Sequence, residues 1–90
     1  MKLPERPRRR QDLIFREIDE DFVIYDPVTD HTLLLNVSSA AVLELCDGSR
    51  TLGDMVDEVA AAFGVEPGEV CAEVEASLEG FARRDFFAPE

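Results

Sequence analysis

The sequence predicts an α+β protein in which a three-stranded antiparallel β-meander precedes three α-helices. Two observations predict this order. Before residue 36, short runs rich in β-branched and aromatic residues are separated by clusters of turn formers. After residue 36, apolar residues recur at three- and four-residue spacing, which is typical of helices that bury one face. A chain of 90 residues suits one such domain with one modest core.

The three strands are expected in the first third of the chain. Residues 13–16 alternate from side to side, and the acidic residues 19–21 form the turn that follows. Residues 22–25 are β-branched and aromatic, and turn formers at 26–30 separate them from a third strand at 31–35. Short connections favour neighbours in sequence order, so the third strand should have one neighbour and one free edge.

The first helix is expected directly after the third strand. Asn36 and Ser38 both stand where an N-cap belongs, because a short side-chain oxygen can accept a hydrogen bond from an otherwise unpaired backbone N–H. Gly48 follows the last apolar residue of this segment and can adopt the left-handed conformation that ends a helix. The strand-to-helix change therefore falls within residues 33–51.

Two more helices are expected in the second half of the chain. Thr51 and Asp54 resemble a capping box that starts the second helix, which should stop at Gly64. Pro67 suits the first residue of the third helix, where its missing N–H is not needed. Phe86 belongs to the closing Phe-Phe pair, which we expect to fold back on the core.

The charge is unevenly distributed along the chain. The formal net charge is −11, and residues 1–10 carry about +4, which leaves about −15 on residues 11–90. We expect residues 1–10 to be a flexible basic arm and residues 11–90 to be the folded domain. The strong acidity disfavours binding to nucleic acid, since phosphate backbones are held by Lys and Arg. No apolar run approaches the roughly 20 residues of a membrane span, and no signal peptide is recognised, so a cytoplasmic protein is expected.

Residue types that carry chemistry are sparse. His31 lies in a predicted strand without a second histidine, so neither a zinc site nor a histidine-based triad is expected. Cys46 and Cys71 both fall at apolar helical positions, and we interpret them as reduced thiols in the core. Glycine-rich phosphate loops are absent from the sequence. We expect a binding module with no catalytic residues, no metal and no cofactor.

Three short motifs resemble the PqqD-type family of peptide chaperones, also called RiPP recognition elements. They are Tyr25-Asp26-Pro27, Leu35-Asn36-x-Ser38-x-Ala40, and Glu44-Leu45-Cys46-Asp47-Gly48-x-Arg50-Thr51. The resemblance covers roughly residues 7 to 88, and it implies a small winged-helix-like domain of three strands followed by three helices. It implies binding of the leader region of a ribosomally made precursor peptide, which is then presented to a modifying enzyme, commonly a radical-SAM protein. Asp30 and Asp85 stand where the family commonly has glycine, and Ser38 replaces a commoner threonine. The pathway, pyrroloquinoline quinone or another peptide product, stays open.

The resemblance also implies where the peptide binds. The leader would add a strand beside the third strand and place its side chains in the cleft between that strand and the third helix, a mode that exposed sheet edges support. Plain core packing is the alternative for the apolar members of this site. The expected peptide-binding residues are Thr32, Leu33, Leu34, Leu35, Val70, Glu73, Val74, Ser77, Leu78 and Phe81.

Two other functions have the same predicted elements. A winged-helix nucleic-acid binder is disfavoured because the third helix carries five glutamates between Glu66 and Glu79. A small acidic interaction domain without leader-peptide function stays open, because the sequence contains nothing that separates it from a peptide chaperone.

Overall fold

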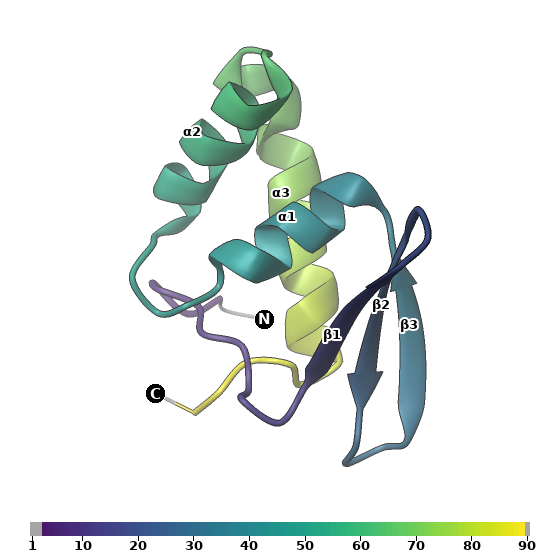
Figure 1. Ribbon diagram of the computed structural model, residues 1–90. Coiled ribbons are helices and arrows are strands. Elements are labelled where there is room, and N and C mark those ends of the chain that lie inside the picture. The colour runs from purple at the N-terminus through teal and green to yellow at the C-terminus, as the bar shows by residue number, and fades with distance from the viewer. Residues whose placement is uncertain (1–2, 90) are drawn as a thin grey trace.

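The computed structural model describes residues 3–89, and it confirms the predicted α+β class and element order (Figure 1). Three strands precede three helices, and the meander lies beside the helical layer. The elements are β1 (Ile14–Ile18), β2 (Asp21–Asp26), β3 (His31–Leu35), α1 (Val37–Leu45), α2 (Leu52–Phe63) and α3 (Pro67–Arg83).

The sheet is an antiparallel meander with the order β1-β2-β3. In its register, Ile24 lies opposite Phe15 on β1 and opposite Leu33 on β3. β3 therefore has β2 on one side, and no other segment of residues 3–89 pairs with its second edge. The predicted free edge of the third strand is confirmed for the described chain.

The two faces of the sheet differ, as the two-residue period of a strand requires. Ile24 and Leu35 are buried against the helices, and Leu33 beside them is half-buried. Ile18 and Leu34 lie on the opposite face and are exposed. The helices thus cover one face of the meander only.

The helix ends follow the capping chemistry that the sequence predicts. Asn36 is the N-cap of α1, and its Oδ1 accepts a 2.8 Å hydrogen bond from the backbone N–H of Ser39. Thr51 and Asp54 form the reciprocal capping box of α2. Gly64 ends that helix with φ 67°, in the left-handed region that favours glycine. Of the two N-cap candidates for α1, Asn36 is correct and Ser38 lies within the helix.

The core lies between the three helices, which pack on one another, and it extends to the inner face of the sheet, against which α1 lies (Figure 1). Met55 and Val59 of α2, and Val74 and Leu78 of α3, are almost completely buried there. Phe86 is buried as expected, with its ring centroid 6.0 Å from that of Phe81. No helix within the described chain is both long and apolar enough to cross a membrane.

The two cysteines have different environments. Cys46 is completely buried, and burial raises the pKa of its thiol to about 12, so it is a core thiol as predicted. Cys71 is exposed on α3, which corrects its assignment to the core. The periodicity of α3 places Cys71 next to the buried Val70, but one position along a helix turns the side chain by roughly 100°. Cys71 thereby faces solvent.

Part of the expected basic arm is docked on the domain. The backbone N–H of Arg9 donates to Cys46 O at 2.9 Å, and the backbone N–H of Gly48 donates to Pro7 O at 3.0 Å. On the other side, the N–H of Ala88 donates to Arg8 O at 2.7 Å. Pro7 is completely buried. The prediction of an exposed arm over residues 1–10 is therefore wrong for residues 7–10. These four residues lie between the end of α1 and the C-terminal segment.

Asp30 and Asp85 both adopt positive φ angles, of 59° in each case. This left-handed conformation favours glycine and is tolerated by aspartate better than by most residues. The two departures from the family pattern are thus substitutions at positions where the backbone favours glycine.

Candidate functional site

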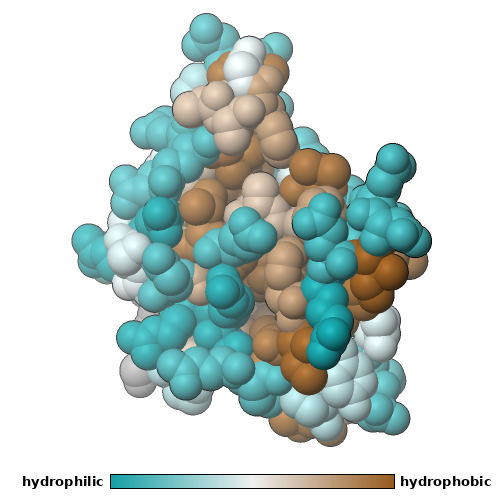
Figure 2. Space-filling view, in the orientation of Figure 1, coloured by the Kyte–Doolittle hydropathy of each residue, from teal (hydrophilic) through white to brown (hydrophobic). Residues whose placement is uncertain are grey.

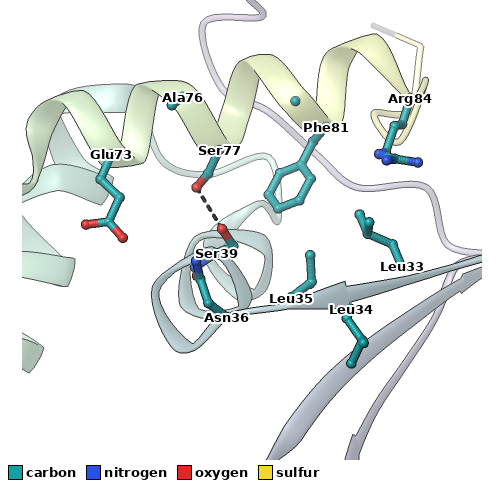
Figure 3. Close-up of a pocket in the computed structure, with 11 residues that line it drawn as sticks. Leu33, Leu34, Leu35, Asn36, Ser39, Glu73, Ala76, Ser77, Phe81 and Arg84 are labelled. Atoms are coloured by element: carbon teal, nitrogen blue, oxygen red, sulfur yellow. Dashed lines mark hydrogen bonds between the residues drawn. The ribbon is translucent and has the colours of Figure 1, made fainter.

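A groove of about 390 Å³ runs between the free edge of β3 and α3 (Figure 3). β3 and the residues that join it to α1 form one wall, and a single stripe of α3 forms the other. The lining residues are Leu33, Leu34, Leu35, Asn36, Ser39, Glu73, Ala76, Ser77, Gly80, Phe81 and Arg84.

The strand wall is apolar. Leu33 and Leu35 point from β3 towards α3, and Phe81 meets them from the helix (Figure 3). Leu34 points to the other side of the strand and is 67% exposed, so it forms the rim of the groove and not its floor (Figure 3). An unpaired strand edge therefore runs along an apolar floor.

Two small residues of α3 leave open space on the helix side of the groove. Ala76 and Gly80 face the groove, and a Cβ added at Gly80 would meet no atom within 4 Å. A glycine inside a helix costs about 0.5–1 kcal/mol relative to alanine, so the open space at Gly80 comes at the expense of helix stability. Gly80 therefore leaves the groove open on the side of α3.

One end of the groove is polar and ties α1 to α3. Ser39 Oγ lies 3.0 Å from Ser77 Oγ (Figure 3), and the Ser38 hydroxyl donates a hydrogen bond to the Glu73 carboxylate. Asn36, the N-cap of α1, lies at the same end. These contacts fix the spacing between the helices at the point where β3 becomes α1.

The other end of the groove is basic. Arg84 lies beside Leu33 at the C-terminal end of α3 (Figure 3). Within residues 3–89 its guanidinium makes no ion pair. The groove thus has a carboxylate at one end and a guanidinium at the other.

Six of the ten residues expected at the peptide site line this groove, while Thr32 lies on the exposed outer face of β3. The six are Leu33, Leu34, Leu35, Glu73, Ser77 and Phe81.

The other three expected residues require a correction. Val70, Val74 and Leu78 are at most 7% exposed and belong to the core, so their side chains do not line the groove. The reason is geometric: the most apolar stripe of α3 faces the other helices, and the neighbouring stripe faces β3.

Sequence reasoning missed five lining residues, which are Asn36, Ser39, Ala76, Gly80 and Arg84. A signal for some of them existed. Positions 73, 76, 77, 80 and 84 follow the three- and four-residue spacing of one helical stripe, and two of them are unusually small. A stripe of small residues beside a predicted free edge indicates an open groove.

A larger cavity of about 500 Å³ lies beside the docked N-terminal residues. Two of its arginines have partners already: Arg9 donates to Leu43 O at 2.9 Å, and Arg10 contacts Asp26. Its walls are therefore held by contacts that stabilise the fold, whereas the groove beside β3 has an unpaired backbone edge.

The fold and the groove define a class of protein, namely small winged-helix-like domains with an open strand edge beside a helix. The chain belongs to the PqqD family, since the family model described as "Coenzyme PQQ synthesis protein D (PqqD)" matches residues 21–86. The predicted family is confirmed.

Curated relatives and solved structures are similar over most of the chain. Relatives named "PqqA binding protein" are 31% identical in Bradyrhizobium diazoefficiens and 29% identical in Rhodopseudomonas palustris strain BisB5, each match covering 92% of this chain and 78% of the relative.

Two solved structures share the fold, each with a TM-score of 0.75 over 92% of this chain. TbiB1 in complex with the TbiA(beta) leader peptide is 16% identical, and the match covers 96% of its chain. The PqqD truncation of Methylobacterium extorquens PqqCD, described as a stand-alone RiPP recognition element, is 22% identical over 88% of its chain.

Proposed function

We propose that this protein is a precursor-peptide chaperone, which binds the leader region of a ribosomally synthesised peptide and presents it to a modifying enzyme. One observation carries the proposal: β3 has an unpaired edge directly beside a groove with an apolar floor. Such an edge offers backbone donors and acceptors to an added strand, and the groove takes the alternate side chains of that strand.

The comparisons support the same function. The curated relatives are named for binding PqqA, and one solved structure with this fold is a complex with a leader peptide. Strand addition at β3 agrees with the open groove there. The residues proposed to contact the peptide are those that line the groove, with Thr32 contributing through its backbone.

We propose that a separate enzyme, a radical-SAM maturase, carries out the chemistry of peptide modification. The groove supplies serine hydroxyls, one carboxylate and one guanidinium, which suit binding and orientation of a peptide. Residues 3–89 hold no cluster of three or more potential metal ligands. The proposed role of this chain is to hold the substrate for its partner.

Titration of the ¹⁵N-labelled protein with a candidate leader peptide tests the proposal. Amides of β3 and of the α3 stripe at residues 73–84 should shift, while amides of α2 should not. In an antiparallel ladder successive residues point their N–H groups to opposite sides. Every second amide of β3 should therefore exchange quickly in the free protein and slowly in the complex.

A pair of proline variants gives an independent test. Thr32→Pro and Leu33→Pro remove N–H groups that face opposite ways, so one should break a bond to β2 and destabilise the fold. The other should stay folded by circular dichroism and bind the leader at least about tenfold more weakly, roughly 1.4 kcal/mol. Leader binding equal to wild type by the folded variant would rule out strand addition at this edge.

A further inference from the structure

We propose that the groove selects the charge pattern of its peptide as well as its shape. The preferred strand carries a basic residue, an apolar residue two positions later, and an acidic residue two positions after that. This inference rests on the proposed function and assigns the two specificity-determining residues, Glu73 and Arg84, at opposite ends of the groove.

Glu73 and Arg84 lie on the same side of α3. They are eleven positions apart, which is about three helical turns and roughly 16 Å along the axis. Both line the groove, and Figure 3 shows them at its two ends with Ser77 and Phe81 between them. A strand lying along the groove would pass both charges.

The direction of the added strand follows from the direction of β3. Leu33 lies at the Arg84 end and Asn36 at the Glu73 end, so β3 runs antiparallel to α3 (Figure 3). The existing sheet is antiparallel throughout, and antiparallel pairing is slightly more stable than parallel pairing. A strand added antiparallel to β3 therefore has its N-terminal end near Glu73 and its C-terminal end near Arg84.

The spacing of the charges follows from strand geometry. Residues four apart lie on the same face of a strand and about 14 Å apart, close to the span between Glu73 and Arg84, whereas residues six apart are about 20 Å apart. The residue midway between them faces the same way. It would meet the apolar floor formed by Leu35 and Phe81.

Both charges are available to a peptide. The Glu73 carboxylate accepts a hydrogen bond from the Ser38 hydroxyl. Because this hydroxyl is neutral, it does not compensate the negative charge of Glu73. Arg84 makes no ion pair with any other residue that the structure describes. Opposite charges at the two ends attract one orientation of a dipolar strand and repel the other, so the pair determines register and direction.

Two synthetic peptides of equal composition test the inference. The first is fluorescein-labelled Thr-Val-Lys-Thr-Leu-Thr-Glu-Val-Thr-Gly, and the second has its Lys and Glu exchanged. Fluorescence anisotropy at about 50 mM salt, where exposed charges are weakly screened, measures both. The wild-type protein should bind the first peptide at least fivefold more tightly.

Two double variants of the protein complete the design. Glu73→Lys with Arg84→Glu should invert the preference, so that the exchanged peptide binds more tightly. Glu75→Lys with Arg83→Glu makes the same change of charge on the same helix, at exposed positions outside the groove, and should keep the wild-type preference. Circular dichroism confirms that both variants are folded.

Each outcome decides a different point. Equal binding of the two peptides would overturn the charge selection while leaving strand addition intact, and tighter binding of the exchanged peptide would overturn the proposed direction. If neither peptide binds, the proposed pattern of a basic, an apolar and an acidic residue at two-residue spacing is wrong. The proposed function has its own test, because the titration with the natural leader does not depend on either synthetic peptide.

Discussion

The guanidinium of Arg10 and the carboxylate of Asp26 form an ion pair, with Nη2 2.5 Å from Oδ1. Asp26 is only 1% exposed and ends β2, and Arg10 also donates a 2.8 Å hydrogen bond to the backbone oxygen of Asp85. The pKa of Asp26 lies below its ordinary value, chiefly because Arg10 donates a hydrogen bond to its carboxylate. One arginine thus joins the N-terminal residues, the β2–β3 hairpin and the C-terminal segment.

Replacing Arg10 should destabilise the domain strongly. Arg10→Met leaves the Asp26 carboxylate buried without its cation, and breaking a buried pair from one side is far costlier than replacing both partners. We expect the melting temperature at about pH 7 to fall by roughly 10 °C or more. Thermal circular dichroism measures it.

Two controls make this prediction specific. Arg10→Met with Asp26→Asn removes the unpaired charge and should recover part of the lost stability. Arg83→Met removes an exposed contact to Glu79 at 4.0 Å and should change the melting temperature little. A double variant less stable than Arg10→Met alone would contradict the explanation.

Acid should destabilise the protein in a defined range of pH. Hydrogen bonds from Ser49, together with Arg50, lower the pKa of Asp47 to about 2, whereas an unfolded aspartate titrates near about 3.9. Because the folded pKa is the lower one, this contribution to stability is present above about pH 4 and is lost as the pH falls towards 2. Asp26 and Asp54, whose pKa values are also lowered, act in the same direction.

Thermal melts between about pH 6 and pH 2 check this. The stability difference between wild type and Asp47→Asn should shrink as the pH falls from about 4 to about 2, because the Asp47 carboxylate takes up a proton in the unfolded state before it does so in the native state. Asp57→Asn, which removes a charge from the exposed surface of α2, is the matched control. A difference for Asp47→Asn that stays constant down to about pH 2 would contradict the assignment.

A small and a large substitution at Gly80 should affect different properties, namely the stability of the fold and the binding of the leader. Gly80→Ala should raise the free energy of unfolding by about 0.5–1 kcal/mol, since the added Cβ meets open space and the helix is favoured. Gly80→Leu would extend into the groove and should weaken leader binding by about tenfold or more. Chemical denaturation and anisotropy measure the two effects.

Gly68 provides the matched control on the same helix. A Cβ there also meets nothing within 4 Å, but Gly68 does not line the groove. Gly68→Leu should therefore leave leader binding unchanged. If Gly80→Leu and Gly68→Leu bind the leader equally well, the peptide does not occupy the groove beside α3.

Truncation at the N-terminus should have two distinct effects. Deleting residues 1–5 removes Leu3, which is half-buried against the core, and should lower the free energy of unfolding by about 1 kcal/mol. Deleting residues 1–10 removes the buried Pro7 and the ion pair of Arg10, and should prevent stable folding at 37 °C. Equal stability of the two truncated proteins would show that the docked residues contribute nothing.

Local signals predicted most of the fold. The capping chemistry of Asn36, Thr51 and Pro67 acts within a few residues, so the sequence contains both the cap and the helix that it starts. The same holds for the turn formers that separate the strands. The element order and the free edge of β3 follow from these signals together with short connections.

The groove was only partly predictable. Periodicity identifies the apolar stripe of α3 but not the element that this stripe faces. Val74 and Leu78, which the sequence predicts at the peptide site, lie in the core for this reason. The docking of residues 7–10 was missed for a related reason. Its partners, such as Cys46 and Ala88, are far away in sequence, and no local pattern indicates them.

The secondary structure, the antiparallel meander and the membership of the PqqD family can be predicted from the sequence, since they depend on local backbone preferences and on short motifs. The side of α3 that faces β3, the opening of the groove at Gly80 and the positions of Glu73 and Arg84 at its two ends follow only from the packing of the folded chain. The physical reason is that a helix presents several stripes, and the rotation of α3 about its axis is decided by core packing against distant residues. On the face of the molecule drawn in Figure 2, apolar side chains are exposed between hydrophilic ones.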